Sequence, residues 1–298
     1  MKKLKFPNYI NKIRIDVGTG STAPNTSLWL KNSNNTAVLC FEADPRSFNI
    51  LMKGGKTNQY PENYRLFKKK YILLKNKKVK KIDPRIIKIF NIAISLKEKK
   101  KIDFYLTDKK NFGTSSLLNP IEKSLNQKVV KKIQISVKKI SFYLKKIDFK
   151  KFKYIEFLKI DTQGNDLNVL KSCDRYLKKI CFVQAEYWAY KSYKGEKTRK
   201  ECLREIKEFM KRQGFSMYYF TITDVFFVND SLKKNILSNY IIDSSVDFEK
   251  GLYRKSFFLN LFPGKLVMYA CIIIFLRKFR LFNFLFYKIL RIKFKKLI

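Results

Sequence analysis

Several polar and glycine residues follow strand-like segments of this sequence, where they could bind a ligand together. The first group is Asp16-Val-Gly18-Thr-Gly20, which comes after a β-branched run and before Pro24. The glycines allow positive φ and a close approach of the backbone to a ligand, and proline suits the first turn of a helix. Free N–H groups at such a helix start attract phosphate and other polar groups. The segment favours a nucleotide-like ligand; its alternative is an ordinary turn between a strand and a helix.

Two acidic groups occupy similar places further along the chain. Glu42 ends the apolar run VLCFE, and Asp161 ends the run IEFLKID before a turn at Gly164. A carboxylate at the end of a second strand can accept hydrogen bonds from both hydroxyls of a ribose, and open α/β sheets bind ligands at the carboxyl ends of their strands. Taken singly, Glu42 could be a solvated strand end and Asp161 an N-cap. Their recurrence at successive strand ends favours one shared site.

The chain contains no histidine. This excludes Ser-His-Asp and Cys-His catalysis and zinc sites that use histidine. A general base must be Asp, Glu, Lys, Tyr, Cys or a bound water. The five cysteines form no Cys-x-x-Cys pair, which is typical of a reduced, intracellular protein with buried thiols; they are Cys40, Cys173, Cys181, Cys202 and Cys271.

The formal charge of +41 points to anionic partners, but its distribution weakens that inference. Lysine is spread over nearly all of the 298 residues, beside abundant Ile, Asn, Phe and Tyr. Such a composition is typical of a coding bias toward AT-rich codons, so the charge alone does not predict nucleic-acid binding. The basic start of the chain shows no apolar core of a secretory signal, and we expect a cytoplasmic protein.

Strand-like and helix-like segments alternate from residue 13 to residue 228, which predicts an α/β fold with a mostly parallel sheet. Strands are expected at 13–17, 37–42, 87–94, 102–106, 133–137, 155–161, 180–186, 216–221 and 224–228. Helices are expected at 24–32, 45–53, 138–146, 165–172 and 198–213. The last two strands have a tight connection, which favours an antiparallel edge on the sheet.

Two regions fall outside this pattern. Residues 54–86 contain glycines, prolines and a dense lysine run, and we interpret them as an insertion in a domain of residues 1–250. Residues 251–298 contain no acidic residue and combine Arg and Lys with Phe, Leu and Ile. On a helix the basic residues would gather near one face, as in a basic amphipathic helix on an anionic membrane surface. Packing on the core or on a partner, or a membrane span, are the alternatives.

Six segments resemble the FkbM-type S-adenosylmethionine-dependent methyltransferases in order and spacing over roughly residues 13–229. They are IDVGTGSTAPNTSLWL, VLCFEADP, NIAIS (91–95), FGTSSLL (112–118), FLKIDTQGNDLNVLKS and a late strand that ends at Glu186. The Lys-Ile-Asp-Thr-Gln-Gly block is the most specific of them and the glycine turn the least. The resemblance implies a class I methyltransferase fold, a Rossmann-like sheet that is mostly parallel, with its last strand antiparallel and helices on its faces. It also implies O-methylation, often of sugar hydroxyls in polysaccharides, glycolipids or natural products.

The resemblance also implies a set of residues that bind S-adenosylmethionine. The methionine part would be bordered by Asp16, Gly18, Thr19 and Gly20. Glu42 would hold the ribose, Asn91 and Ala93 would lie near the adenine, and Asp161 would face the transferred methyl group. The chain departs from the family pattern at Thr22, at Gln163, where an acidic residue is common, and at Asp166, where Glu is frequent.

Methyl transfer to a hydroxyl requires alignment of the reactants and removal of one proton. Without histidine, the base would be a carboxylate, and Asp161 and then Glu186 are the candidates. A divalent metal on Asp161 is open by analogy with other sugar methyltransferases, but no ligand cluster indicates one. Residues 112–118 and 187–200 are expected to contact the acceptor, a saccharide, glycolipid or related small molecule.

Two other classes of function remain open. Gly18-x-Gly20-x-x-Ala23 with Glu42 about 20 residues later satisfies the dinucleotide fingerprint, and Tyr187-x-x-x-Lys191 resembles the catalytic pair of short-chain dehydrogenases. The chain could therefore be an NAD-dependent oxidoreductase, although Asp16 before the glycines and the Asp161 block favour methyl transfer. A non-catalytic basic module that binds a membrane or nucleic acid is the second alternative. The Asn/Asp-Pro-Pro-Tyr/Phe motif expected for amino methylation of bases is absent.

Overall fold

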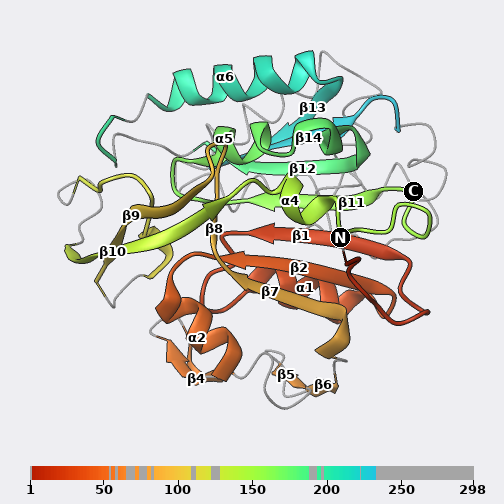
Figure 1. The fold of residues 1–298 in the computed structure, drawn as a ribbon, viewed down its shortest axis with the longest axis horizontal. Coiled ribbons are helices and arrows are strands. Elements are labelled where there is room, and N and C mark those ends of the chain that lie inside the picture. The colour runs from red at the N-terminus through yellow and green to blue at the C-terminus, as the bar shows by residue number, and fades with distance from the viewer. Residues whose placement is uncertain are drawn as a thin grey trace, which may run out of the picture. The chain divides into compact units, whose positions relative to one another are not determined.

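The structure, a computed structural model, describes residues 2–53, 55–57, 60–64, 71–73, 79–81, 84–108, 112–121, 128–187, 193–195, 198–221 and 223–232. Its largest element is a seven-stranded sheet with the strand order β13-β14-β12-β11-β1-β2-β7 (Figure 1). These strands are β1 (Lys12–Val17), β2 (Thr36–Glu42), β7 (Ile87–Asn91), β11 (Ile155–Ile160), β12 (Ile180–Glu186), β13 (Phe215–Phe220) and β14 (Asp224–Asn229).

The direction of the strands places their polar ends together. Strands β7, β2, β1, β11 and β12 are parallel to one another, whereas β14 pairs antiparallel with both β12 and β13. The predicted mostly parallel sheet with an antiparallel last strand is therefore confirmed. The antiparallel strand is not the edge, however, because β14 lies between β12 and the edge strand β13. The carboxyl ends of the parallel strands share one side of the sheet.

The central strands of the sheet are buried on both faces. Every residue of β2 and of β11 is buried, as expected for strands with packed elements on both sides. Helix α1 (Pro24–Asn32) packs on the sheet through Trp29, whose ring meets Phe157 of β11 edge-to-face at 5.6 Å. This packing fixes the start of α1 next to the end of β1.

The predicted strands 102–106 and 133–137 do not join the main sheet. They form β9 (Lys99–Thr107) and β10 (Val129–Lys138), an antiparallel pair to which β8 (Ala93–Ile94) adds a third strand. Figure 1 shows this small sheet beyond the carboxyl ends of β1 and β2, in the direction of their arrowheads. Local composition identified the strands, but not which sheet they enter.

The predicted single strand 87–94 is also wrong, because the chain leaves the main sheet at Ile92. There the Ile92 N–H donates to the Glu42 carbonyl at 3.2 Å, and the Asn91 side chain donates to the same oxygen at 2.9 Å. Both contacts fasten the end of β7 to the end of β2. The chain then continues as β8, which turns its residues toward the small sheet.

Most helix predictions agree with the structure. Besides α1, the helices are α2 (Pro45–Lys53), α4 (Ser141–Leu144), α5 (Asp166–Lys171) and α6 (Arg199–Arg212), with 3₁₀ turns at Pro84–Ile86, Phe112–Thr114 and Asp174–Lys179. The helix predicted over 138–146 is only four residues long. Its continuation tightens, because the N–H groups of Lys146 and Ile147 donate to carbonyls only three residues back. Helix α6 begins with a capping box between Thr198 and Glu201.

The structure describes parts of the predicted insertion and none of the predicted tail. Within 54–86 the structure describes two short antiparallel pairs, β3 (Gly55–Thr57) with β4 (Tyr60–Tyr64), and β5 (Tyr71–Leu73) with β6 (Val79–Lys81). The predicted tail, residues 251–298, lies outside the described residues. Among the helices that the structure describes, none is long and apolar enough to cross a membrane.

Candidate active site

A cavity of about 260 Å³ lies at the carboxyl ends of the parallel strands. The cavity is lined at four strand ends and by two further segments. The lining residues are 17–22, 24 and 25 from the end of β1 onward, 41–43 at the end of β2, 92–94 after β7, 159, 161–163 and 165 around the end of β11, 104 in β9, and 113, 115 and 117 in the next loop. Gly18, Thr19, Gly20, Glu42, Ala93 and Asp161, all predicted to bind a cofactor, are therefore in one place. Asp16 and Asn91 are not among the lining residues.

The glycine loop is held between two strand ends. Gly18 has φ +74°, and a Cβ atom there would lie 1.7 Å from the carbonyl oxygen of Asp161. The N–H groups of Gly18 and Thr19 donate to the Phe41 carbonyl at 2.9 and 3.2 Å. Only glycine fits position 18, because the loop is attached to β2 on one side and pressed against the end of β11 on the other.

Glu42 is held by backbone donors at the wall of the cavity. Its Oε2 accepts from the Gly20 N–H at 2.7 Å, and its Oε1 accepts from the Asp44 N–H at 2.8 Å. Burial raises the pKa of Glu42 to about 7, although these two donors favour the charged form. Each oxygen keeps further acceptor capacity, so the carboxylate can receive two neighbouring hydroxyl donors.

Lys159 connects the glycine loop to two carboxylates. Its Nζ donates to the Gly18 carbonyl at 3.1 Å and to Asp161 Oδ2 at 3.2 Å, and lies 3.6 Å from Asp16 Oδ1. Burial opposes the charge of Lys159, but the two carboxylates outweigh this effect and raise its pKa above the ordinary value. Lys159 is therefore a charged group in a buried position, and the sequence analysis did not single it out.

Asp16 supports the glycine loop through its contacts with Lys159 and Thr26. The side chain is fully buried, and its Oδ2 accepts from the Thr26 hydroxyl of α1 at 2.7 Å. Burial raises its pKa, while Lys159 and Thr26 act in the opposite direction. Asp16 does not line the cavity itself, and its place beside the methionine part of a cofactor stays a prediction. Asp16 instead holds Lys159 and α1 in place under the residues that line the cavity.

Asp161 and Glu186 are joined by the side chain of Gln163. The Gln163 Nε2 donates to Asp161 Oδ1 at 2.8 Å and to Glu186 Oε2 at 3.0 Å. Burial opposes the charge of Asp161, but Lys159 and the hydrogen-bond donors lower its pKa. Burial, and then the charge of Asp161, raise the pKa of Glu186 to about 11. At neutral pH Asp161 is thus a carboxylate that opens to the cavity, with its side chain 37% exposed, whereas Glu186 keeps its proton and does not line the cavity.

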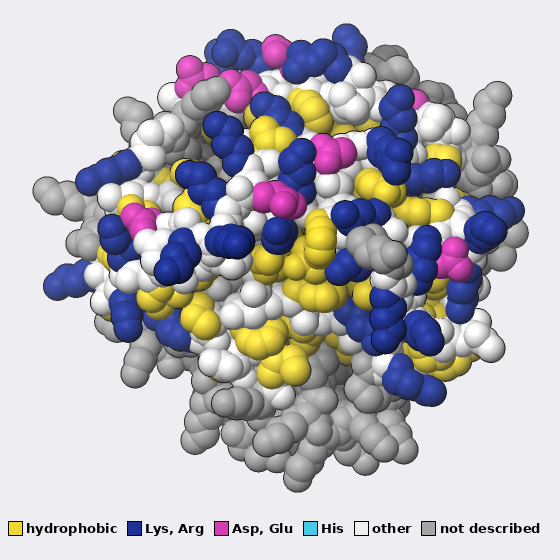
Figure 2. All heavy atoms as spheres, viewed as in Figure 1, with side chains coloured by type: hydrophobic (Ala, Val, Ile, Leu, Met, Phe, Trp, Pro, Cys, Tyr) yellow, Lys and Arg dark blue, Asp and Glu magenta, His cyan; other side chains and the backbone are white. Residues whose placement is uncertain are grey.

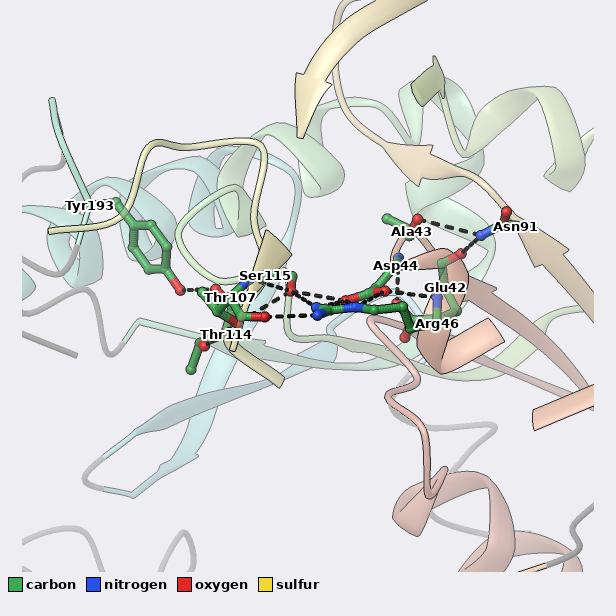
Figure 3. A network of polar contacts seen from close by, with 9 residues as sticks. All are labelled: Glu42, Ala43, Asp44, Arg46, Asn91, Thr107, Thr114, Ser115 and Tyr193. Carbon is green, nitrogen blue, oxygen red and sulfur yellow. Dashed lines mark hydrogen bonds and ion pairs between the residues drawn. The ribbon is translucent and has the colours of Figure 1, made fainter. Parts of the chain in front are cut away.

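A second network fastens the loop 112–118 to the end of β2 (Figure 3). Arg46 forms an ion pair with Asp44 at 2.7 Å and donates to the Thr107 carbonyl at 2.8 Å, and Ser115 donates to Asp44 at 2.9 Å. Tyr193 donates to the Thr114 carbonyl at 2.9 Å. This loop was expected to contact the acceptor, and the network holds it beside the cavity that Gly113, Ser115 and Leu117 line.

Asn91 and Ala93, both expected near an adenine, differ in their placement. The Asn91 side chain is turned to the backbone of Glu42 and Ala43 and is exposed. Ala93 is buried and lines the cavity together with Ile92, Ile94 and Phe104. These residues form an apolar wall of the cavity, whereas Asn91 contacts the end of β2 and does not line the cavity. The position of an adenine stays a prediction.

The family comparison agrees with this geometry. A family model described as the FkbM methyltransferase domain matches residues 16–217. The chain belongs to the FkbM methyltransferase family. In the comparisons with curated proteins and with solved structures, no protein matches. The match begins at Asp16 and takes in Glu42, Asp161 and Gln163, so the FkbM domain contains every segment that lines the cavity.

The structure gives no support to the dehydrogenase-like pair in this FkbM domain. Tyr187 is buried, and its hydroxyl donates to the Thr221 carbonyl and accepts from Arg199, away from the residues that line the cavity. Lys191 lies outside the described residues. A tyrosine held in this way stabilises the connection before β14.

Proposed function

We propose that this chain is an S-adenosylmethionine-dependent O-methyltransferase that acts on a hydroxyl of a saccharide, a glycolipid or a related small molecule. The observation that carries the proposal is the Glu42 carboxylate, held by two backbone N–H groups at the wall of a cavity that the glycine loop also lines. A carboxylate in this position is suited to a ribose, because it can accept from two adjacent hydroxyls.

The cavity residues fit S-adenosylmethionine in shape and in charge. Gly20, where a Cβ would meet nothing within 4 Å, leaves room for close backbone approach, Ala93 and Ile94 would provide an apolar wall for the adenine, and Glu42 would hold the ribose. The only lysine or arginine that lines the cavity in the described part of the chain is Lys159, whose charge is already shared by two carboxylates. The carboxyl groups of Asp16, Glu42 and Asp161 outnumber this one cation, which suits a cationic cofactor and a neutral hydroxyl acceptor.

When bound, S-adenosylmethionine would supply an activated methyl group whose leaving group needs no acid. The chain must then orient the acceptor hydroxyl and receive its proton. Asp161 is suited to both tasks, because it is ionised at neutral pH and lines the cavity. Glu186 is less suited to receive a proton, since its own pKa is raised to about 11.

The basic tail supports a further part of the proposal. Residues 251–298 carry Arg and Lys among Phe, Leu and Ile without an acidic residue, which suits a cytoplasmic enzyme that associates peripherally with an anionic membrane surface. Lys and Arg side chains are scattered over the face of the described chain in Figure 2 and form no single stripe there. The tail is therefore a better candidate for membrane contact than this face.

The first experiment is calorimetric titration of the full chain with S-adenosylmethionine, S-adenosylhomocysteine and NAD. We expect micromolar binding of the first two and a loss of about 10- to 100-fold in the Glu42→Gln variant, because hydrogen bonds to a charged group contribute about 1.5–3 kcal/mol. Glu98→Gln, which changes an exposed carboxylate paired with Lys138, should leave the affinity unchanged. Binding of NAD alone would favour the oxidoreductase alternative, and binding of none of the three would favour the non-catalytic module.

The affinity should also depend on pH through Glu42. Its pKa of about 7 in the free protein means that the carboxyl group is largely protonated at pH 6 and ionised at pH 8. Ribose hydroxyls donate to the ionised form, so binding lowers this pKa and releases a proton. We expect the affinity for S-adenosylhomocysteine to rise from pH 6 to pH 8 and then level off. The same titration on Glu42→Gln should be flat, and an equal rise in the variant would assign the effect to another group.

A further inference from the structure

The wall of the cavity around Asp161 contains an arrangement that the proposed reaction does not itself require. Gln163 lies between two acidic side chains that come from different strands, Asp161 at the end of β11 and Glu186 at the end of β12. Both N–H groups of one amide nitrogen are used, with one bond to each carboxyl group at 2.8 and 3.0 Å. The two carboxyl groups are also hydrogen-bonded to each other, a contact that lowers the pKa of Asp161 and raises that of Glu186, and the amide supplies a further donor to each of them.

The rest of Gln163 is fixed as well. Its Oε1 lies 3.0 Å from the Tyr193 hydroxyl, whose single hydrogen it shares with the Thr114 carbonyl at 2.9 Å, and its backbone carbonyl accepts from the Ser116 hydroxyl at 2.9 Å. Its φ is +55°, a left-handed conformation that is uncommon for a residue other than glycine. Such a conformation persists only where the surroundings hold it. The amide is therefore locked in the bridging position.

A pair of carboxyl groups offers the kind of oxygen ligands that a hard divalent cation binds, and such a cation needs several of them. Here the bridging place is filled by N–H donors, and a cation could not share it with them. Lys159 supplies the positive charge on the other oxygen of Asp161 at 3.2 Å. In the described part of the chain no group of three His, Cys, Asp or Glu residues is arranged to hold a metal ion. The residues present do not fit a divalent metal at this point.

We propose that the amide of Gln163 takes the bridging role of a divalent cation between Asp161 and Glu186, so that this site positions Asp161 without a metal ion. The bridge itself is a property of the free chain. Only its role in catalysis rests on the proposed function. Gln163 is a positioning residue: it orients the Asp161 carboxylate and connects it to the loop 112–118 and to Tyr193.

The substitution Gln163→Glu tests the proposal directly. It removes the two N–H donors and adds a carboxylate of nearly the same shape between two others, which is a donor set that Mn²⁺ accepts. We expect the Gln163→Glu chain to bind Mn²⁺ at least about tenfold more tightly than the native chain, followed by the electron paramagnetic resonance of free Mn²⁺. This gain should disappear when Asp161→Asn is added.

A matched control is Gln134→Glu. Gln134 also donates to an aspartate, Asp103, and that pair is exposed and includes Lys132 rather than a second acidic group. This variant adds the same charge but should bind no more Mn²⁺ than the native chain. Circular dichroism and thermal unfolding of each variant establish that the chain is folded before the titration.

Two outcomes would overturn the proposal. Native binding of Mn²⁺ that is lost in Asp161→Asn would mean that a cation, and not the amide, bridges the acidic groups. Binding by Gln163→Glu no tighter than that by Gln134→Glu would mean that positions 161, 163 and 186 do not converge on one point. Neither result depends on S-adenosylmethionine, so failure of the metal test and failure of the cofactor titration are separate findings.

Discussion

The substitution Gly18→Ala is expected to destabilise the fold by more than about 4 kcal/mol and to disrupt the cavity that the glycine loop lines. The left-handed backbone at φ +74° costs an alanine about 1–2 kcal/mol. The larger effect is steric, because the new Cβ would lie 1.7 Å from the Asp161 carbonyl oxygen. That oxygen belongs to the backbone directly after the buried strand β11, where the Asp161 N–H donates to the Val17 carbonyl at 3.0 Å, and it cannot move independently. Urea unfolding, followed by the fluorescence of the buried Trp29, measures the change in the free energy of unfolding.

Two other glycines separate the steric effect from the conformational one. Gly20 has φ +68° and Gly214 has φ +80°, and a Cβ at either would meet nothing within 4 Å. Gly20→Ala and Gly214→Ala should therefore cost only about 1–2 kcal/mol each. Equal destabilisation by all three substitutions would contradict the contact between the glycine loop and the end of β11.

Local sequence patterns predict much of the fold. The helix predictions 24–32 and 45–53 coincide with α1 and α2, since a proline starts each of them and an apolar face follows. Glu42 and Asp161 could be placed in one site, because the carboxyl ends of parallel strands share one edge. These features depend on residues close in sequence and on one general rule of sheet topology.

The parts that sequence reasoning missed depend on contacts between distant segments. The small sheet of β8, β9 and β10 is set by pairings such as Ile133 with Phe104, which leave no local signal. A lysine inside the buried run IEFLKI was the one available sign of Lys159, because a buried ammonium group needs a partner. The bridge made by Gln163 could not be foreseen, since it joins a turn after β11 to the end of β12.

The second large effect is expected from Lys159→Met, which removes the one cation shared by Asp16 and Asp161. Removal of one partner from a buried ion pair costs about 3–5 kcal/mol, because the remaining charge is left uncompensated. Here the Lys159 side chain is 6% exposed and the Asp16 side chain is fully buried, and the Gly18 carbonyl also loses its donor. The matched control Lys132→Met breaks an exposed pair with Asp103 and should cost less than about 1 kcal/mol.

The loss in Lys159→Met should grow as the pH rises from 5 to 8. In the native chain Lys159 lowers the pKa of Asp161, so this carboxylate contributes stability above its ordinary pKa, and that contribution is lost only as the pH falls through the lowered value. In the variant the pKa values of Asp161 and Asp16 both rise in the folded state. A carboxyl group with a raised pKa stabilises the fold only while it is protonated, so the variant loses stability as the pH rises through that value. Urea unfolding of both chains at pH 5 and pH 8 measures the difference, and a loss independent of pH would mean that Lys159 acts through packing rather than through charge.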